Sequence, residues 1–351
     1  MKEKYIRYVN SKTAVLIYTP VNRRYLTGFQ SSLGYLLLTE KENFLFVDGR
    51  YFEAACKIAS NAKVLIIESL FDQINRILLD NKIEKVLIEV ENEIRFLNNL
   101  KIRLNARVIA SEPLSRRLAV MRSIKSKEEV ESIILAQRIA EKAFSDVLQY
   151  IRIGITEREI AAFLEYRMKL YGSEGETFET IAVSGPNSSL PHGVPSDRKI
   201  SDGDFITMDF GAKTNGYCSD MTRTVAVGSV TDEMEKVYNT VLLAQQKVIE
   251  TVAAGVDCKT ADTTARELIT KAGYEAYFNH STGHGIGLEV HELPNVSPRS
   301  EGIKLRVGQV ISDEPGIYIP GKFGVRIEDM LIITKSGCKN LTKAPKHLII
   351  L

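Results

Sequence analysis

Two aspartates on either side of an Asn215-Gly216 dipeptide have the spacing of paired ligands. Asn-Gly between apolar stretches is a strong signal for a two-residue hairpin loop, and the flanking sequences here are FITMDFGAKT and YCSDMT. Such a loop sets Asp209 opposite Thr222 and leaves Asp220 two residues along on the same face. Diagonal neighbours of this kind lie ~7–8 Å apart, close enough for two carboxylates to share an ion. The alternative is that one aspartate caps a turn and the other faces solvent, but Asp209 lies in an apolar run, where a carboxylate needs a partner.

A second hairpin is predicted around Gly321, in the sequence EPGIYIPGKFGVRIED, and it carries two glutamates. With the turn centred on Gly321, Glu314 stands directly opposite Glu328. Like charges that face each other across a sheet are destabilising unless a cation lies between them. Taken alone, this hairpin is also compatible with an exposed pair of glutamates that repel each other.

One histidine lies in a glycine-rich segment, Gly283-His284-Gly285-Ile-Gly287. Glycines without a Cβ let the backbone approach another group closely and leave the imidazole unobstructed. Because glycine loops are common, a buried histidine that hydrogen-bonds to the backbone is the more frequent explanation for this segment taken alone.

Together these segments supply four carboxylates and one imidazole. Oxygen-rich ligation with one histidine favours Mn²⁺, Co²⁺ or Fe²⁺, with Zn²⁺ as an alternative. One ion rarely uses four carboxylates and a histidine, whereas two ions about 3.5–4 Å apart, bridged by carboxylates and a water, account for the number. The predicted metal ligands are Asp209, Asp220, His284, Glu314 and Glu328.

The elements that must position these residues follow from the hydrophobic pattern. Short apolar runs at 14–18, 35–38, 44–47 and 86–90 predict strands, and 51–60 and 69–81 predict helices. The first part of the chain is therefore predicted to be an α/β domain. The pattern breaks near Glu112-Pro113, which places the domains at residues 1–115 and 116–351.

Two capping boxes open helices at the start of the second domain. Ser126 with Glu129, and Thr156 with Glu159, have the N-cap to N3 spacing of that motif. From Phe178 onward strand patterns dominate, with further helices near 232–254 and 259–272, so this domain is predicted to mix helices and sheet.

Composition excludes several classes of function. The 351 residues are 44% hydrophobic and 26% charged, with a net charge of +2, which indicates a globular protein of two domains. The balanced charge gives no reason to expect nucleic acid or a membrane as partner, and no apolar run approaches the ~18 residues of a membrane span. The N-terminus lacks the apolar core of a secretory signal. The four cysteines have no CxxC spacing and are expected to be free thiols in a reducing compartment, so we expect a cytoplasmic protein.

The motifs MDFGA, SDMTRT, TGHGIG, EPGIY and VRIED, in this order, resemble those of the pita-bread metallopeptidases. That family includes methionine aminopeptidase, aminopeptidase P and prolidase, and all five of its ligand positions are filled here. The resemblance implies an α+β pita-bread catalytic domain behind the α/β domain. Members of the fold that only bind partners lose metal ligands, which argues against a non-catalytic binding module.

Residues outside the ligand set indicate the branch. Methionine aminopeptidases are typically shorter, lack an N-terminal α/β domain and lack counterparts of Arg326 and His291, so that alternative is disfavoured. The segments RYLTGF at 24–29 and VDGRY at 47–51 resemble the creatinase/prolidase N-terminal domain. Creatinase lacks the metal ligands. The resemblance thus implies hydrolysis of the Xaa-Pro bond in dipeptides or short peptides by a metal-bridging hydroxide, and a homodimer.

The resemblance also implies roles for single residues. Glu314 would pass a proton to the leaving proline nitrogen. His192 and His291 would bind substrate and donate hydrogen bonds to its carbonyl oxygen and to the tetrahedral intermediate. Arg326 would orient the metal-binding carboxylates.

Four further residues have weaker arguments from sequence. Phe178 is a substrate-binding candidate. Arg299 would either grip a substrate carboxylate or be a solvated loop arginine. His280 would either act on the substrate like the other two histidines or have a supporting or structural role. His347 belongs to no motif and is expected to be structural. The sequence does not separate a dipeptidase from an aminopeptidase that acts on longer peptides.

Overall fold

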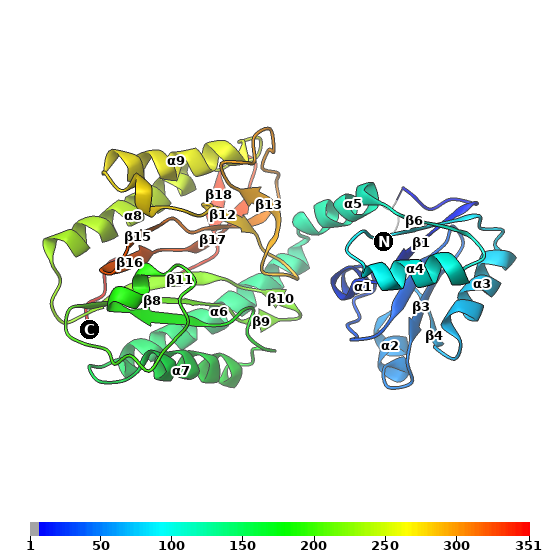
Figure 1. Ribbon diagram of the computed structural model, residues 1–351, viewed down its shortest axis with the longest axis horizontal. Helices are drawn as coiled ribbons and strands as arrows, with labels where there is room; N and C mark the ends of the chain where they lie inside the picture. Colours follow the sequence, from blue (N-terminus) through cyan, green and yellow to red (C-terminus); the bar gives the residue numbers. More distant parts are fainter. Residues whose placement is uncertain (1–6) are drawn as a thin grey trace. The chain divides into compact units, whose positions relative to one another are not determined.

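A computed structural model of the protein describes residues 7–351, and the chain divides into two compact units, Met1–Arg122 and Ser123–Leu351 (Figure 1). The boundary predicted after residue 115 lies inside helix α5 (Glu112–Ser123). Pro113 does not interrupt that helix, because the first turn makes no use of the N–H that proline lacks.

The first unit is built on a mixed sheet that is interleaved with helices. Its strands are β1 (Thr13–Ile17), β2 (Tyr35–Leu38), β3 (Asn43–Val47), β4 (Lys63–Ile66), β5 (Lys85–Ile88) and β6 (Arg107–Ala110). Its other helices are α1 (Pro20–Thr27), α2 (Phe52–Ile58), α3 (Leu70–Asp80) and α4 (Ile94–Arg103). Over the described residues the sheet order is β4-β3-β2-β1-β5-β6, with β3–β4, β1–β5 and β5–β6 parallel. The central strand β1 is buried along its whole length, as expected where both faces of a sheet are covered.

The second unit is described in full, and its strands lie between two pairs of helices. The helices are α6 (Lys127–Tyr150), α7 (Glu157–Leu170), α8 (Asp232–Thr251) and α9 (Cys258–Lys271), with short 3₁₀ turns η2 (Gly185–Ser189) and η3 (Glu275–Tyr277). The strands are β7 (Ile181–Ser184), β8 (Asp204–Phe210), β9 (Lys213–Thr214), β10 (Tyr217–Cys218), β11 (Met221–Val227), β12 (Gly283–Gly285), β13 (Glu292–Val296), β14 (Val310–Asp313), β15 (Gly316–Ile319), β16 (Phe323–Arg326), β17 (Asp329–Ile333) and β18 (Cys338–Asn340). In Figure 1, α8 and α9 lie on one side of the strands, and α6 and α7 lie on the other.

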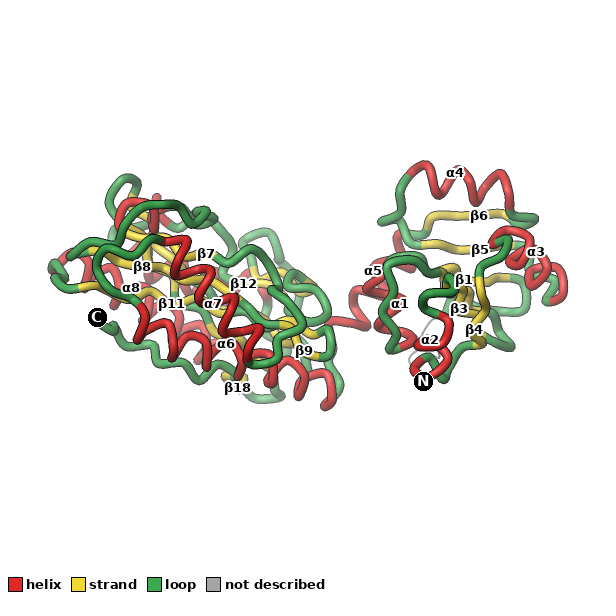
Figure 2. The backbone as a smooth tube through the Cα atoms, turned by 90° about the horizontal axis from the view of Figure 1, so that it is seen from below, coloured by secondary structure: helices red, strands yellow, loops and turns green. Residues whose placement is uncertain are grey.

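The strands of the second unit form two main sheets, β11-β8-β7 and β13-β12-β14-β17-β18, with the small hairpins β9–β10 and β15–β16. Apolar side chains of α6 and α7 pack on the first sheet, and Phe144, Leu164 and Ile206 belong to one buried cluster there. Those of α8 pack against β15 and β16, and α9 packs against α8 and β13. Figure 2 shows α7 along its length. This packing holds the central strands between two apolar layers.

Both predicted capping boxes are confirmed. Ser126 accepts a hydrogen bond from the Glu129 amide while the Glu129 carboxylate accepts from the Ser126 amide, and Thr156 and Glu159 do the same. Each box satisfies amides that the first helical turn leaves without intrahelical partners, and so fixes where α6 and α7 begin.

Both predicted hairpin registers are confirmed as well. Asp209 pairs with Thr222, and Asn215 and Gly216 have positive φ, as a type I′ loop requires. In the second hairpin the ladder β15–β16 stops after the pair of Gly316 with Arg326 and resumes in β14–β17 with Asp313 opposite Asp329. Glu314 and Glu328 therefore lie in the gap between two ladders that share one register.

Some elements were not predicted from the sequence, namely α1, α4, α5, β4 and β6. The strands β4 and β6 are edge strands of four residues, too short for a clear alternating pattern. Within residues 7–351, no helix is both long and apolar enough to span a bilayer.

Candidate metal centre

A cavity of about 550 Å³ in the second unit gathers most of the predicted site residues. All five predicted ligands line it, together with three histidines, an aromatic residue and an arginine. These further residues are His192, His280, His291, Phe178 and Arg326. Arg299 is exposed and is not part of the cavity wall, and neither is His347.

The ligands come from separate elements that meet at the cavity wall. Asp209 is the second-last residue of β8, and Asp220 precedes β11 after the Asn-Gly turn. Donor atoms of Asp220, His284 and Glu328 lie within 4.8 Å of one another, an arrangement that could hold a metal ion. His284 Nε2 lies 3.7 Å from Asp220 Oδ2 and 3.2 Å from Glu314 Oε1. The hairpins thus bring side chains far apart in sequence to within ligand distance.

Protein groups compensate the charge of these buried carboxylates only in part. Burial, together with the charges of Glu328 and Asp209, raises the pKa of Asp220 well above its usual value. Burial and the charges of Glu314 and Asp209 do the same to the pKa of Glu328. Asp209 Oδ1 and Glu328 Oε1 are buried and accept no hydrogen bond within the described part of the chain. A buried carboxylate oxygen without a partner is costly, so this donor set fits divalent cations.

The backbone fixes the orientation of the His284 ring. Its Nδ1 lies 3.1 Å from the carbonyl oxygen of Gly285, which can only accept, so Nδ1 is the donor. In the neutral ring Nε2 then carries the lone pair and faces the carboxylates. A hydrogen bond from the far nitrogen is the usual support of a metal-binding histidine.

His284 and Glu314 lie close enough to form an ion pair. Burial opposes ionisation of Glu314, but the hydrogen bond and charge of His284 outweigh it and lower the pKa of Glu314 to about 2. Burial likewise favours neutral His284, yet the hydrogen bond and charge of Glu314 raise the pKa of the imidazole. Ser312 Oγ also donates to Glu314 Oε1 at 3.0 Å, which fixes one carboxylate oxygen.

Arg326 orients two of the carboxylates from within the protein. Its Nη2 donates to Asp209 Oδ2 at 2.6 Å, and its Nε donates to Thr222 Oγ1 at 3.0 Å. Thr222 Oγ1 in turn donates to Glu328 Oε2 at 2.7 Å. Arg326 is only 3% exposed, so its planar donors are held in place rather than solvated.

His280 belongs to a hydrogen-bonded series behind the cluster. Its Nδ1 lies 2.8 Å from the Ser281 carbonyl oxygen and must donate to it, so the neutral ring accepts at Nε2 from Tyr318 Oη, 2.9 Å away. Tyr318 Oη accepts from Arg326 Nη1 at 2.7 Å. Burial lowers the pKa of His280 and raises that of Tyr318 to about 12. Both side chains are therefore uncharged near neutral pH, and His280 is tied to Arg326 through Tyr318.

The other two histidines of the cavity have exposed side chains. His291 lies beside His284, with ring centroids 4.2 Å apart. Burial and the charge of His284 lower the pKa of His291, which leaves its ring neutral near pH 7. His192 lines the cavity from the loop after η2. Neither belongs to the clustered ligand atoms, and both are able to meet a bound molecule.

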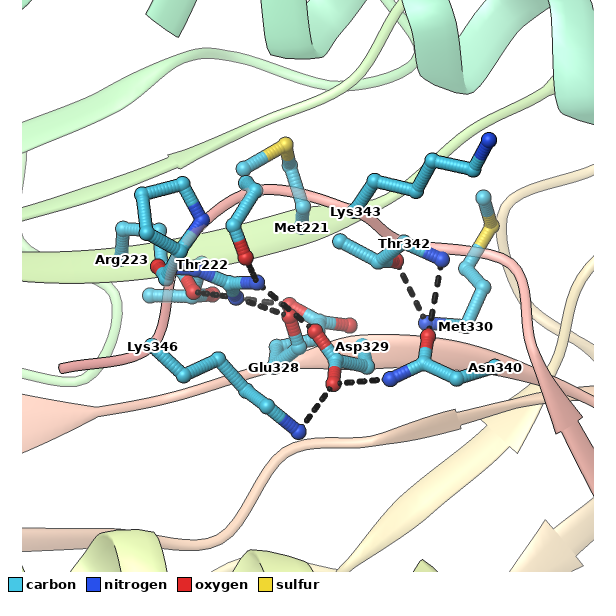
Figure 3. A network of polar contacts seen from close by, with 12 residues as sticks. Met221, Thr222, Arg223, Glu328, Asp329, Met330, Asn340, Thr342, Lys343 and Lys346 are labelled. Atoms are coloured by element: carbon cyan, nitrogen blue, oxygen red, sulfur yellow. Dashed lines mark hydrogen bonds and ion pairs between the residues drawn. The ribbon is translucent and has the colours of Figure 1, made fainter.

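A second layer of charge supports the strands behind the ligands. Figure 3 shows Asp329 between Arg223, at 2.8 Å, and Lys346, at 2.7 Å. Although burial opposes it, these two cations lower the pKa of Asp329. Arg223 Nη1 also donates to the carbonyl oxygen of Glu328 at 2.5 Å. Arg223 thereby fixes the peptide group that joins Glu328 to Asp329.

Sequence reasoning missed Tyr318, Thr222 and Ser312, whose hydroxyls bind the ligands or Arg326. Tyr318 and Thr222 lie inside the quoted motifs EPGIY and SDMTRT, so the motifs were a usable signal. No comparable signal marks Ser312, because its hydroxyl reaches Glu314 only through the local strand geometry.

Comparisons with known proteins agree with this geometry. The model of metallopeptidase family M24 matches residues 131–335, and that of the Creatinase/Prolidase N-terminal domain matches residues 10–124. The Xaa-Pro dipeptidase of Pyrococcus horikoshii is 42% identical over 341 residues, which cover 97% of this chain and 95% of that protein.

Two solved structures are similar over nearly the whole chain. An Xaa-Pro dipeptidase from Bacillus anthracis has a TM-score of 0.93 at 39% identity, covering 96% of this chain and 95% of its own. An X-Pro aminopeptidase from Thermotoga maritima has a TM-score of 0.93 at 37% identity, covering 99% and 100%.

Proposed function

Because the chain belongs to metallopeptidase family M24, we propose that it hydrolyses the bond before proline in dipeptides or short peptides. The predicted fold, an α/β domain followed by a pita-bread catalytic domain, is confirmed by the same comparisons. The observation that carries the proposal is the cavity in which four acidic side chains and His284 converge beside free histidines. The relatives named as Xaa-Pro dipeptidases support the substrate class.

The residues that would hold metal are the acidic residues and the histidine that line the cavity together. We propose that they bind two divalent ions, Mn²⁺ or Co²⁺ in preference to Fe²⁺ or Zn²⁺. The proposed ligands are Asp209, Asp220, His284, Glu314 and Glu328. Bound ions of this kind lower the pKa of a water toward neutrality and polarise a carbonyl group. The two buried oxygens that accept no hydrogen bond are in position to bind such ions.

The side chains of the protein would supply the remaining chemistry. Glu314 carries the proton from water to the proline nitrogen, which must be protonated to leave. His192 and His291 donate hydrogen bonds to the substrate carbonyl oxygen, whose negative charge grows as the tetrahedral intermediate forms. Arg326 keeps Asp209 and, through Thr222, Glu328 oriented during the reaction. His280 helps to hold Tyr318 and Arg326 and is proposed to be a supporting residue.

Proline poses a particular problem of recognition. The Xaa-Pro bond is a tertiary amide with no N–H, and its ring fixes φ near −65°. A site for this bond must therefore recognise the shape of the proline ring, because there is no N–H to which it could hydrogen-bond. Phe178 on the cavity wall is proposed to contact the substrate. We assign no such part to Arg299, because it is exposed and does not line the cavity.

Substrate comparison tests the proposal. An Xaa-Pro dipeptide is expected to be cleaved with kcat/KM at least about 10- to 200-fold above that for the matching Xaa-Ala dipeptide, the range that one methylene in an apolar pocket provides. Xaa-Pro-Yaa tripeptides, measured alongside, separate a dipeptidase from an aminopeptidase. Equal or faster cleavage of peptides with N-terminal methionine and no proline would instead favour the methionine aminopeptidase-like alternative. The homodimer stays a prediction, which sedimentation analysis can check.

A further inference from the structure

The loop that carries His192 has little regular structure of its own. It runs from Ser184, at the end of β7, through the short turn η2 to Ser196. His192 is exposed on it and lines the cavity. Contacts from outside the loop must therefore set the position of this imidazole.

The base of the loop closes on one buried carboxylate, that of Glu157 in the first turn of α7. Glu157 is 0% exposed. Its Oε1 accepts from Ser184 N at 2.7 Å and from Ser184 Oγ at 2.8 Å. Its Oε2 accepts from Ser196 N at 3.0 Å and from Ser196 Oγ at 2.6 Å. Asn187 Nδ2 lies within 3.2 Å of both oxygens. One carboxylate thus joins the beginning, the middle and the end of the loop.

The helix N-terminus reinforces this junction. The amide of Glu157 donates to the Arg198 carbonyl oxygen, and that of Arg158 donates to the Ser196 carbonyl oxygen. A carboxylate in the first turn of a helix is favoured by the helix dipole. Arg198 Nη1 donates to Ser184 Oγ at 2.6 Å, so the buried negative charge also has a cation nearby.

Residues beside the proposed metal site hold the other side of the loop. Arg326 Nη1 donates to the carbonyl oxygen of Pro191, the residue before His192, at 3.1 Å. Ser188 Oγ accepts from the amide of Gly324 in β16 at 2.9 Å. The loop is therefore fixed at two places, by Arg326 and β16 beside the cavity and by Glu157 at its base.

We propose that Glu157 is a positioning residue that holds His192 in place at the cavity. The inference rests on the proposed function, because it deepens the part given there to His192. A carboxylate suits this position because all of its neighbours are donors and its two oxygens only accept. Glu157→Gln would place an NH₂ group against N–H and O–H donors and leave buried donors unmatched, so the loop would shift.

A double-mutant cycle tests the proposal. Glu157→Gln is expected to lower kcat on an Xaa-Pro dipeptide by about 10- to 100-fold, the cost of a small misplacement of an active-site group. Metal content should not change. In a His192→Ala background the same substitution should change kcat by less than about threefold, since coupled residues are non-additive. The matched control is Glu159→Gln on the same helix. The Glu159 carboxylate accepts hydrogen bonds from Thr156 and has no contact with the loop among the described residues, so this substitution is expected to leave kcat near that of the parent.

A purely structural glutamate predicts a different pattern. Equal losses from Glu157→Gln with and without His192, or no loss at all, would overturn the proposal. If Glu157→Gln does not fold, Ser196→Ala removes the Oγ contact to Glu157 of 2.6 Å, together with the longer Oγ contacts to Asn187 and to the Arg198 amide, and keeps the amide contact of Ser196 to Glu157. Ser196→Ala should then lower kcat severalfold in the parent and leave kcat unchanged in the His192→Ala background. An equal loss in both backgrounds contradicts the proposal. Failure of the proposed function is separate: the unsubstituted protein would not cleave Xaa-Pro dipeptides.

Discussion

Asp220→Asn is expected to lower kcat/KM on an Xaa-Pro dipeptide by more than about 10³-fold. Asp220 lies with His284 and Glu328 in the ligand cluster. Loss of a residue that only hydrogen-bonds to a metal ligand typically lowers metal affinity or activity about 10- to 100-fold, so the loss of a ligand itself should cost more. The amide keeps the shape of the side chain but removes the charge that would bind the ion. Activity and metal content measured on the same preparation check this expectation.

The stability of this variant should behave differently from its activity. Burial and neighbouring carboxylates raise the pKa of Asp220, so the metal-free folded state binds more protons than the unfolded state and loses stability as pH rises above the usual aspartate range. Because asparagine carries no charge, Asp220→Asn removes the contribution of Asp220 to this loss of stability at high pH. Its metal-free Tm at pH 7 should therefore equal or exceed that of the metal-free parent. Near-normal turnover with metal still bound would contradict the ligand role.

His291→Ala is expected to lower kcat by roughly 10²–10³-fold, the cost of removing one donor to a developing oxyanion. The exposed ring lies beside His284 and lines the cavity. Its lowered pKa leaves it neutral near pH 7, with one N–H to donate. Because the hydrogen bond strengthens in the transition state, KM should change less than kcat.

Metal content and Tm distinguish this role from the alternatives. The account expects both to stay close to those of the unsubstituted protein. His347→Ala, at an exposed histidine outside the cavity wall, is the matched control and should leave kcat unchanged. If His291→Ala loses metal along with activity, His291 is a ligand instead. A lower Tm with little kinetic change would identify a structural residue.

The geometry of the ligand cluster could be predicted because turn chemistry fixes register. Asn215-Gly216 and Gly321 set the two hairpins, and side chains alternate faces along a strand, so Asp209 and Glu314 could be placed relative to their partners. The ladder around Glu314 and Glu328 is interrupted, which sequence did not predict, yet the register continues across the gap.

Contacts between distant segments could not be predicted in this way. No spacing rule relates His280 to Tyr318, or Glu157 to Ser196, because tertiary packing brings them together. A proline such as Pro113 is compatible with a loop or with the first turn of a helix, and local sequence does not decide between them. Arg299 is an example in the other direction. Its sequence context suggested a substrate contact, but the residue does not line the cavity.

Titration of the metal-free protein with Mn²⁺, with bound ions and Xaa-Pro dipeptide hydrolysis followed together, tests the central claim most directly. The account predicts no hydrolysis by the metal-free protein and full activity when about two ions are bound per chain, because four carboxylates and one histidine exceed what one ion uses. Full activity in protein shown to contain no divalent metal would contradict it.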